Sequence, residues 1–105
     1  MEGSAFVLVR SVVANPDDRK PFDQWYQTDH IPLVFAEIAN VNRIWRFWSK
    51  SDPSIHYSLS EFADIGEFER AAGSEGFKYI VLQVVEMKIC TNASFSVWMV
   101  WMKRM

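Results

Sequence analysis

Cysteine is almost absent from the chain, because Cys90 is the single one among 105 residues. A lone cysteine cannot form a disulfide within the chain, nor can it build a cysteine-based metal site there. No histidine lies near Cys90 in the sequence, so the residue is most simply a small buried apolar side chain. This cysteine usage favours an intracellular, reducing compartment, and we expect a cytoplasmic protein.

Glycine, basic stretches and long apolar runs are scarce as well. Four glycines leave no room for the Gly-rich loop that cradles the phosphates of a nucleotide cofactor. Eleven Lys and Arg are mixed along the chain with thirteen Asp and Glu, so the sequence has no basic stripe for nucleic acid. No apolar stretch approaches the roughly 18 to 20 residues that span a bilayer. We therefore expect neither a nucleic-acid partner nor a membrane partner.

The sequence also lacks a metal-binding pattern. Its two histidines, His30 and His56, are far apart, and no carboxylate-histidine spacing typical of a metal site occurs. We expect no metal and no cofactor. Haem held by His30 stays open as an alternative.

Aromatic residues, in contrast, are abundant, with five Trp, eight Phe and three Tyr. A length of 105 residues fits a single domain, 1–105, and a domain of this size buries a smaller share of its surface than a large one does. Some of the aromatic surface should therefore face a partner subunit or a ligand.

The apolar pattern predicts the order strand, helix, strand, strand, helix, strand. A Val-rich strand at 5–14 ends in a polar turn at 15–21, and a helix follows from 22 to about 40. Pro32 removes a backbone donor, so this helix should kink or restart around His30. The remaining expected elements are a hairpin of strands at 41–49 and 55–63, a helix from Ile65 to about Gly73 capped by Asp64, a helix at 75–88 and a closing strand at 95–102.

This order matches a ferredoxin-like βαββαβ fold of the α+β class, with a four-stranded antiparallel sheet and helices on one face. The other face of the sheet has no helix to cover it, and the closing strand is largely apolar on both of its sides. An uncovered apolar face is most commonly buried by a second copy related by a two-fold axis. We therefore predict a homodimer.

The stretch FDQWYQTDHIPLV at 22–34 contains the most specific motif of the chain. Its run Tyr-Gln-Thr-Asp-His-Ile-Pro-Leu, from Tyr26 to Leu33, has the pattern aromatic-x-x-x-His-x-Pro-Leu. Together with the predicted order of elements, this run resembles the dimeric α+β barrel superfamily, nearest to the EthD-like branch named for a protein of ether degradation. Relatives include polyketide cyclases, monooxygenases of aromatic substrates, haem-degrading enzymes, lactone isomerases and proteins with no known activity. The resemblance implies a fold and a dimer, and it does not choose an activity.

His30 is the candidate catalytic residue. An imidazole exchanges protons near neutral pH, and the helix break at Pro32 can free a backbone carbonyl that fixes the tautomer of the ring. The alternative is that His30 makes such a bond for structural reasons alone.

Five further residues are candidates for substrate binding. Tyr26 lies four positions before His30 and so on the same helical face, where it can line a pocket or pack as ordinary core. Asp29 directly precedes His30, and because neighbours on a helix point about 100° apart the two side chains need not touch, so Asp29 is more simply a solvated acid. His56 and Tyr57 alternate along their strand, so only one of them can face a pocket. The candidate substrate-binding set is Trp25, Tyr26, Asp29, Trp45 and Tyr57.

Two functions of different classes stay open. One is a cofactor-independent cyclase, isomerase or oxygenase that holds a small apolar or aromatic molecule and uses His30 for proton transfer. The other is a non-catalytic ligand-binding or accessory protein, in which His30 only orients a ligand or the helix break.

Overall fold

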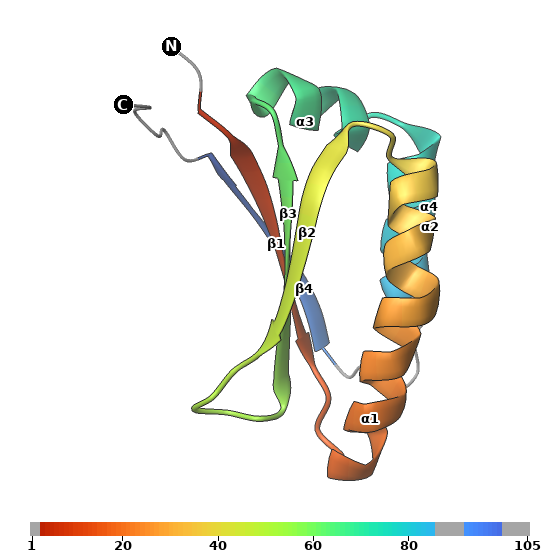
Figure 1. Cartoon of the computed structure of the whole chain (residues 1–105), viewed down its shortest axis with the longest axis vertical. Coiled ribbons are helices and arrows are strands. Elements are labelled where there is room, and N and C mark those ends of the chain that lie inside the picture. The colour runs from red at the N-terminus through yellow and green to blue at the C-terminus, as the bar shows by residue number, and fades with distance from the viewer. Residues whose placement is uncertain (1–2, 86–91, 100–105) are drawn as a thin grey trace.

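The protein is an antiparallel sheet with its long helices packed on one face (Figure 1). The computed structural model describes residues 3–85 and 92–99. The α+β class predicted from the sequence is confirmed. The elements are β1 (Ala5–Val12), α1 (Pro16–Trp25), a π-helical turn η1 (Tyr26–His30), α2 (Ile31–Glu37), β2 (Val41–Trp48), β3 (Ile55–Phe62), α3 (Ile65–Ala72), α4 (Glu75–Val85) and β4 (Asn92–Met99).

The strands lie in the order β2-β3-β1-β4, and each neighbouring pair is antiparallel. β1 is an inner strand, which pairs with β3 on one side and with β4 on the other. The pairing of β1 with β3 sets Leu8 opposite Leu59 and Ser11 opposite His56. Because side chains alternate along a strand, these two pairs lie on opposite faces of the sheet.

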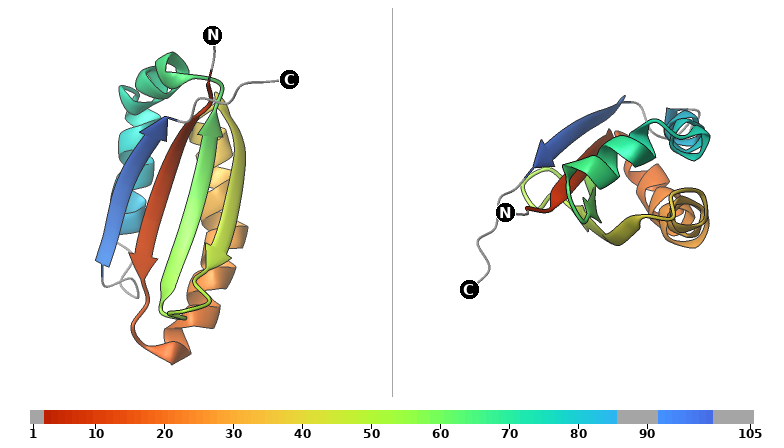
Figure 2. Two further views of the ribbon diagram at one scale, coloured as in Figure 1. Left: turned by 90° about the vertical axis from the view of Figure 1, so that its left-hand side faces the viewer. Right: turned by 90° about the horizontal axis from the view of Figure 1, so that it is seen from above.

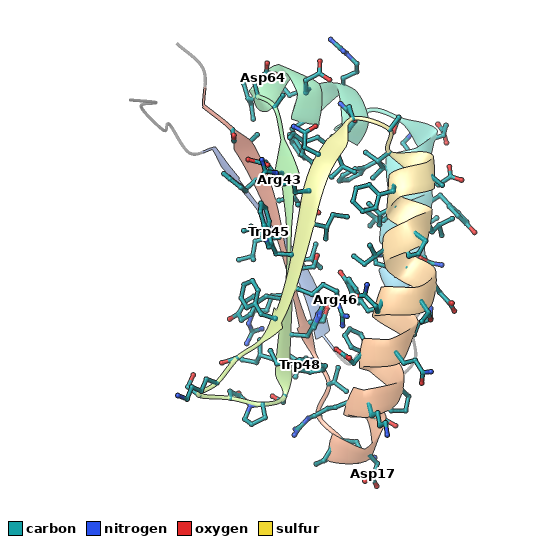
Figure 3. The ribbon with its side chains drawn as sticks, viewed as in Figure 1. Asp17, Arg43, Trp45, Arg46, Trp48 and Asp64 are labelled. Carbon is teal, nitrogen blue, oxygen red and sulfur yellow. The ribbon has the colours of Figure 1, made fainter. Side chains whose placement is uncertain are left out.

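The two faces of the sheet have different surroundings. Val7 and Val9 of β1 are at most 9% exposed and belong to the core beneath the helices. Among the described residues no helix covers the opposite face (Figure 2), and there Trp45 and Phe47 of β2 are 41% and 46% exposed. The consecutive residues Trp45 and Arg46 point to opposite sides of β2 (Figure 3). Alternation along β2 therefore assigns each side chain to one face.

α1 begins earlier than the sequence pattern indicated. Residues 15–21, predicted as a turn, contain the first turn of the helix instead. The side chain of Asn15 accepts a hydrogen bond from the backbone N–H of Asp17 (3.0 Å), and Pro16 takes the first helical position, where no N–H donor is required. The turn prediction was wrong because the Asn-Pro pair here caps and starts a helix.

The interruption predicted near Pro32 takes the form of the π-helical turn η1. Pro32 has no N–H to donate to the carbonyl of Thr28, four residues earlier. The N–H of Ile31, the residue before Pro32, donates instead to the carbonyl of Tyr26, five residues earlier. The α-helix restarts at Ile31, as predicted. Tyr26 and His30, the first and last residues of η1, are 1% and 3% exposed. The wide turn therefore brings both rings to the buried side.

The remaining helices agree with the sequence pattern. The side chain of Asp64 accepts from the backbone N–H of Glu67 (2.8 Å) and caps α3 as predicted. α4 confirms a helix from residue 75, while residues 86–88 of that prediction, and 100–102 of the predicted closing strand, lie outside the described residues. In the described part of the chain, no helix combines the length and apolar character needed to cross a membrane.

Candidate functional site

A cavity lies between the sheet and the helices. Its volume is about 50 Å³, several times the roughly 10 to 15 Å³ that one water molecule needs. Among the described residues its walls are mostly apolar, with side chains from β1, β3, α2 and α4. The polar side chains in its lining are Tyr26, His30, Ser58 and Ser60. The lining suits an apolar ligand, but the volume is smaller than the roughly 150 Å³ of a cavity that holds benzene, so an aromatic ring can enter only if the side chains of the wall move apart.

His30 lies at the wall of this cavity, at the end of η1. Its Nδ1 is 2.7 Å from Oε1 of Gln83 on α4. Since a carbonyl oxygen can only accept, Nδ1 carries the proton and Nε2 is left as the proton acceptor of the ring. The partner that sets the tautomer is therefore a side chain from a distant helix, and the backbone carbonyl expected from the sequence does not take this role.

The surroundings of His30 keep its ring neutral. Burial is the main cause that lowers the pKa of His30 below its ordinary value of 6.5, and the charge of Arg46 acts in the same direction. The hydrogen bond with Gln83 raises this pKa and opposes part of the effect. At neutral pH, His30 is therefore an uncharged base whose acceptor nitrogen is Nε2.

Trp25 and Tyr26 lie beside His30, as their spacing predicts. The Trp25 ring stacks on the imidazole with centroids 5.0 Å apart, and the Tyr26 ring meets it at 63° with centroids 4.6 Å apart. Asp29 is different, because it is exposed and its carboxylate accepts a hydrogen bond from the Thr28 hydroxyl (3.1 Å). Its position at the surface agrees with the interpretation of Asp29 as a solvated acid. Asp29 does not line the cavity.

Trp45 and Tyr57 do not lie with His30. The pairing of β2 with β3 puts both on the helix-free face, where Tyr57 stacks on Phe47 with centroids 5.3 Å apart. Their assignment to one site with His30 is therefore corrected. Strand alternation turns His56, the neighbour of Tyr57, towards the helices instead.

His56 is a candidate that the sequence reasoning passed over. It is 0% exposed, and the rings of Phe22, Tyr26 and Trp48 surround it at centroid distances of 5.1, 4.6 and 5.0 Å. Neither ring nitrogen has a hydrogen-bond partner in the described part of the chain. Burial, followed by the charge of Arg46, lowers the pKa of His56 to about 4, so this ring is neutral as well. The sequence showed that either His56 or Tyr57 could face a pocket. Alternation along the strand does not say which of its two faces the helices cover, so it could not choose between them.

Arg46 links β2 to the helical segment before the cavity. Its guanidinium donates to Asp23 Oδ1 (2.7 Å) and to Gln27 Oε1 (3.0 Å), and it lies 5.0 Å from the centre of the Tyr26 ring. The indole N–H of Trp48 also donates to Asp23 Oδ1 (3.0 Å). The bond from Trp48, with further contributions from Arg46, lowers the pKa of the Asp23 carboxyl against the opposing effect of burial. Asp23 therefore stays charged, and its contacts with Arg46 and Trp48 connect α1 to β2.

Within residues 3–85 and 92–99, no group of three His, Cys, Asp or Glu side chains is placed to hold a metal ion. The described site itself contains neutral histidines, hydroxyl groups and aromatic rings.

Comparison with known proteins places the fold. No model of a known protein family matches the sequence, and no curated protein matches it significantly. Solved structures do match. SnoaB, a cofactor-independent oxygenase from Streptomyces nogalater, is 12% identical with a TM-score of 0.67 over 96% of each chain. An EthD family protein from Bacillus halodurans C-125 is 14% identical with a TM-score of 0.69, over 90% of this chain and 96% of that one. A conserved protein from Methanosarcina mazei Go1 is 18% identical with a TM-score of 0.65 over 92% of each chain.

SnoaB and the EthD family protein belong to the dimeric α+β barrel superfamily. The chain has the fold of this superfamily, as the motif at 26–33 and the order of elements predicted. At these identities the likeness concerns the fold, so the chemistry has to be argued from the residues of this chain.

Proposed function

We propose that this protein binds a small, flat, apolar or aromatic molecule in the cavity, and that His30 transfers a proton to or from a phenolic or carbonyl-bearing group of that molecule. The activity would be that of a cofactor-independent cyclase, isomerase or oxygenase. The observation that carries the proposal is a buried, neutral histidine at the wall of an apolar cavity, with its Nδ1 bonded to Gln83.

The proposed role follows from the chemistry of the ring. With Nδ1 bonded to Gln83, Nε2 can accept a proton from an acidic O–H or C–H of the ligand. Loss of that proton leaves an electron-rich phenolate or enolate, the common starting point for ring closure, isomerisation and attack on oxygen. Trp25 and Tyr26 hold the imidazole in place from two sides. The description of SnoaB as a cofactor-independent oxygenase agrees with a reaction of this kind on the same fold.

The hydrogen bond between His30 and Gln83 also supports a second function, non-catalytic ligand binding. The bond between His30 and Gln83 joins η1 to α4 across 53 positions of sequence, which is also what a purely structural clamp would do. In that case the cavity would still bind its ligand, and His30 would not take part in any reaction.

Occupation of the cavity can be tested with toluene, whose single ring is small and apolar. We expect toluene to shift the NMR signals of cavity residues such as Val7 and Val34. Val81→Phe should abolish binding by filling the cavity, since Val81 lines it. Leu82→Phe is the matched control, because Leu82 is 56% exposed and the variant adds a ring outside the cavity. Equal toluene binding in both variants would place the ligand elsewhere and contradict the proposal.

We also propose that two copies pair through their helix-free sheet faces. Trp45 and Phe47 are exposed on this face. Leu8 of β1 and Leu59 of β3 lie opposite each other on the two inner strands of the same face. An apolar surface of this kind is stable when a second copy covers it.

Sedimentation should give a mass of about twice the 12.3 kDa of one chain. Leu59→Asp places a charge in the centre of the proposed interface and should yield monomers or insoluble protein, because burying an unpaired charge is unfavourable. Tyr79→Asp, at an exposed position on α4, should remain dimeric. A monomeric parent protein, or a dimeric Leu59→Asp variant, would rule out this interface.

A further inference from the structure

Next to the cavity lies a group of buried polar side chains that the proton transfer by His30 does not use. We call His56, Ser11 and Arg46 the polar cluster. His56 and Ser11 are 0% exposed. Both nitrogens of His56, the hydroxyl oxygen of Ser11 and Nε of Arg46 have no hydrogen-bond partner in the part of the chain that the structure describes.

Strand pairing brings the polar cluster together on the helix-covered face. Ser11 of β1 lies opposite His56 of β3, and Arg46 of β2 lies opposite Ser58, the next residue of β3 on the same face. Directly opposed side chains on neighbouring antiparallel strands have Cβ atoms about 4.5 to 5.5 Å apart. The polar cluster thus spans three adjacent strands.

The polar cluster adjoins the cavity along β3, although none of its three residues is among those that line the cavity. Ser60 and Ser58 line the cavity, and His56 is the next residue of the strand on that face. Two residues of a strand extend about 7 Å, which is close to the length of one aromatic ring with an oxygen attached. Tyr26 separates the two histidines, since its ring lines the cavity and lies 4.6 Å, centroid to centroid, from both His30 and His56.

Such a cluster is unfavourable as mere packing material. A buried polar group without a hydrogen-bond partner lowers the stability of the folded protein, and apolar side chains of the same shape would avoid this cost. His56 in particular sits among three aromatic rings, where phenylalanine would pack without any loss of hydrogen bonds. A polar group from a bound molecule would instead give these atoms a partner.

We propose that the polar cluster recognises a neutral oxygen, above all a phenolic hydroxyl, on an aromatic ligand whose ring occupies the cavity. A neutral histidine and a serine hydroxyl each offer one donor and an acceptor, which matches a hydroxyl group. A carboxylate fits less well, because the Arg46 charge is already paired with Asp23 at 2.7 Å. The inference rests on the proposed function, since it specifies which ligand the cavity takes and which end of it points along β3.

Phenol and toluene provide the test, because the two molecules differ by a hydroxyl in place of a methyl group. At pH 7 the affinity of each is measured by NMR titration on the parent protein, His56→Phe, Ser11→Ala and His56→Gln. We expect the parent protein to bind phenol at least as tightly as toluene. The ratio of phenol affinity to toluene affinity should fall by about tenfold or more in His56→Phe, with toluene binding retained. The ratio should fall less in Ser11→Ala. It should also fall less in His56→Gln, because glutamine keeps a donor and an acceptor at this position.

The outcomes separate this inference from the proposed function. Toluene binding with an unchanged ratio in both His56→Phe and Ser11→Ala would overturn the role of the polar cluster and leave the cavity as a ligand site. Failure of the parent protein to bind either compound would overturn the proposed function and this inference with it. Benzoate bound more tightly than phenol would also overturn the inference, because it would show that the cluster selects an anion.

Discussion

The His56→Phe variant is expected to resist acid better than the parent protein. The folded-state pKa of His56 is about 4, below the ordinary value of 6.5 that applies when the chain is unfolded. As the pH falls through 6.5, the unfolded chain therefore takes up a proton that the folded protein does not, and stability is lost. For His56 alone this loss amounts to about 2 kcal/mol at pH 5 and about 3 kcal/mol near pH 4.

Urea unfolding at pH 7 and pH 5 measures this effect. At pH 7 His56→Phe should be as stable as the parent or more so, because the substitution removes two unpartnered nitrogens from an aromatic environment. On going to pH 5 it should lose less stability than the parent by about 2 kcal/mol. Ser11→Ala removes a neighbouring polar group that does not titrate, so it should keep the acid sensitivity of the parent. A parallel pH response of the parent and His56→Phe would show that His56 is not buried as a neutral ring.

His30→Asn is expected to lower the turnover of the natural substrate by about a hundred- to ten-thousand-fold, the usual contribution of a general acid or base. The substitution keeps a polar side chain and removes the basic nitrogen. The measurement is kcat/KM for the phenolic or carbonyl compound that the protein proves to convert. Because burial lowers the pKa of His30, the decline of the parent activity on acidification should occur at lower pH than the titration of an ordinary histidine.

Asp29→Asn is the matched control for His30→Asn, since it makes a similar change at the adjacent residue, which is exposed. It should turn over at close to the parent rate. Toluene titration of His30→Asn shows whether the cavity is still formed. If this variant folds, binds toluene and works at the parent rate, His30 is a structural clamp and the non-catalytic function gains support.

Neighbouring residues determine the features that were predicted well. The helix restart at Ile31 follows from Pro32, which lacks the N–H that a regular helix requires at that position. The start of α3 follows from Asp64, whose side chain reaches the third residue of its own helix. Chain-local signals failed where one pattern has two meanings, as with Asn15 and Pro16, which suit both a turn and a helix start.

The candidate site was predictable to the extent that it lies on one helical segment. Trp25, Tyr26 and His30 meet because the spacing along the chain itself sets their directions. Gln83 could not be inferred, because its contact with His30 depends on where α4 lies against η1. Arg46 likewise gained its position only through strand pairing and its bonds to α1 and η1.

Contacts within a few positions of the chain set the kind and order of the elements, the place of the helix interruption and the group of aromatic and histidine residues there, so these features could be predicted from the sequence. Which face of each strand lies under the helices depends on packing between distant segments, so it could not be predicted from the sequence. Alternation divides a strand into two sets of side chains without saying which set is inside, so Tyr57 and His56 were equally eligible until the helices were placed. The packing of α1, η1 and α4 on one side of β3 turned His56 into a buried group beside the cavity and left Tyr57 and Trp45 on the opposite, helix-free face.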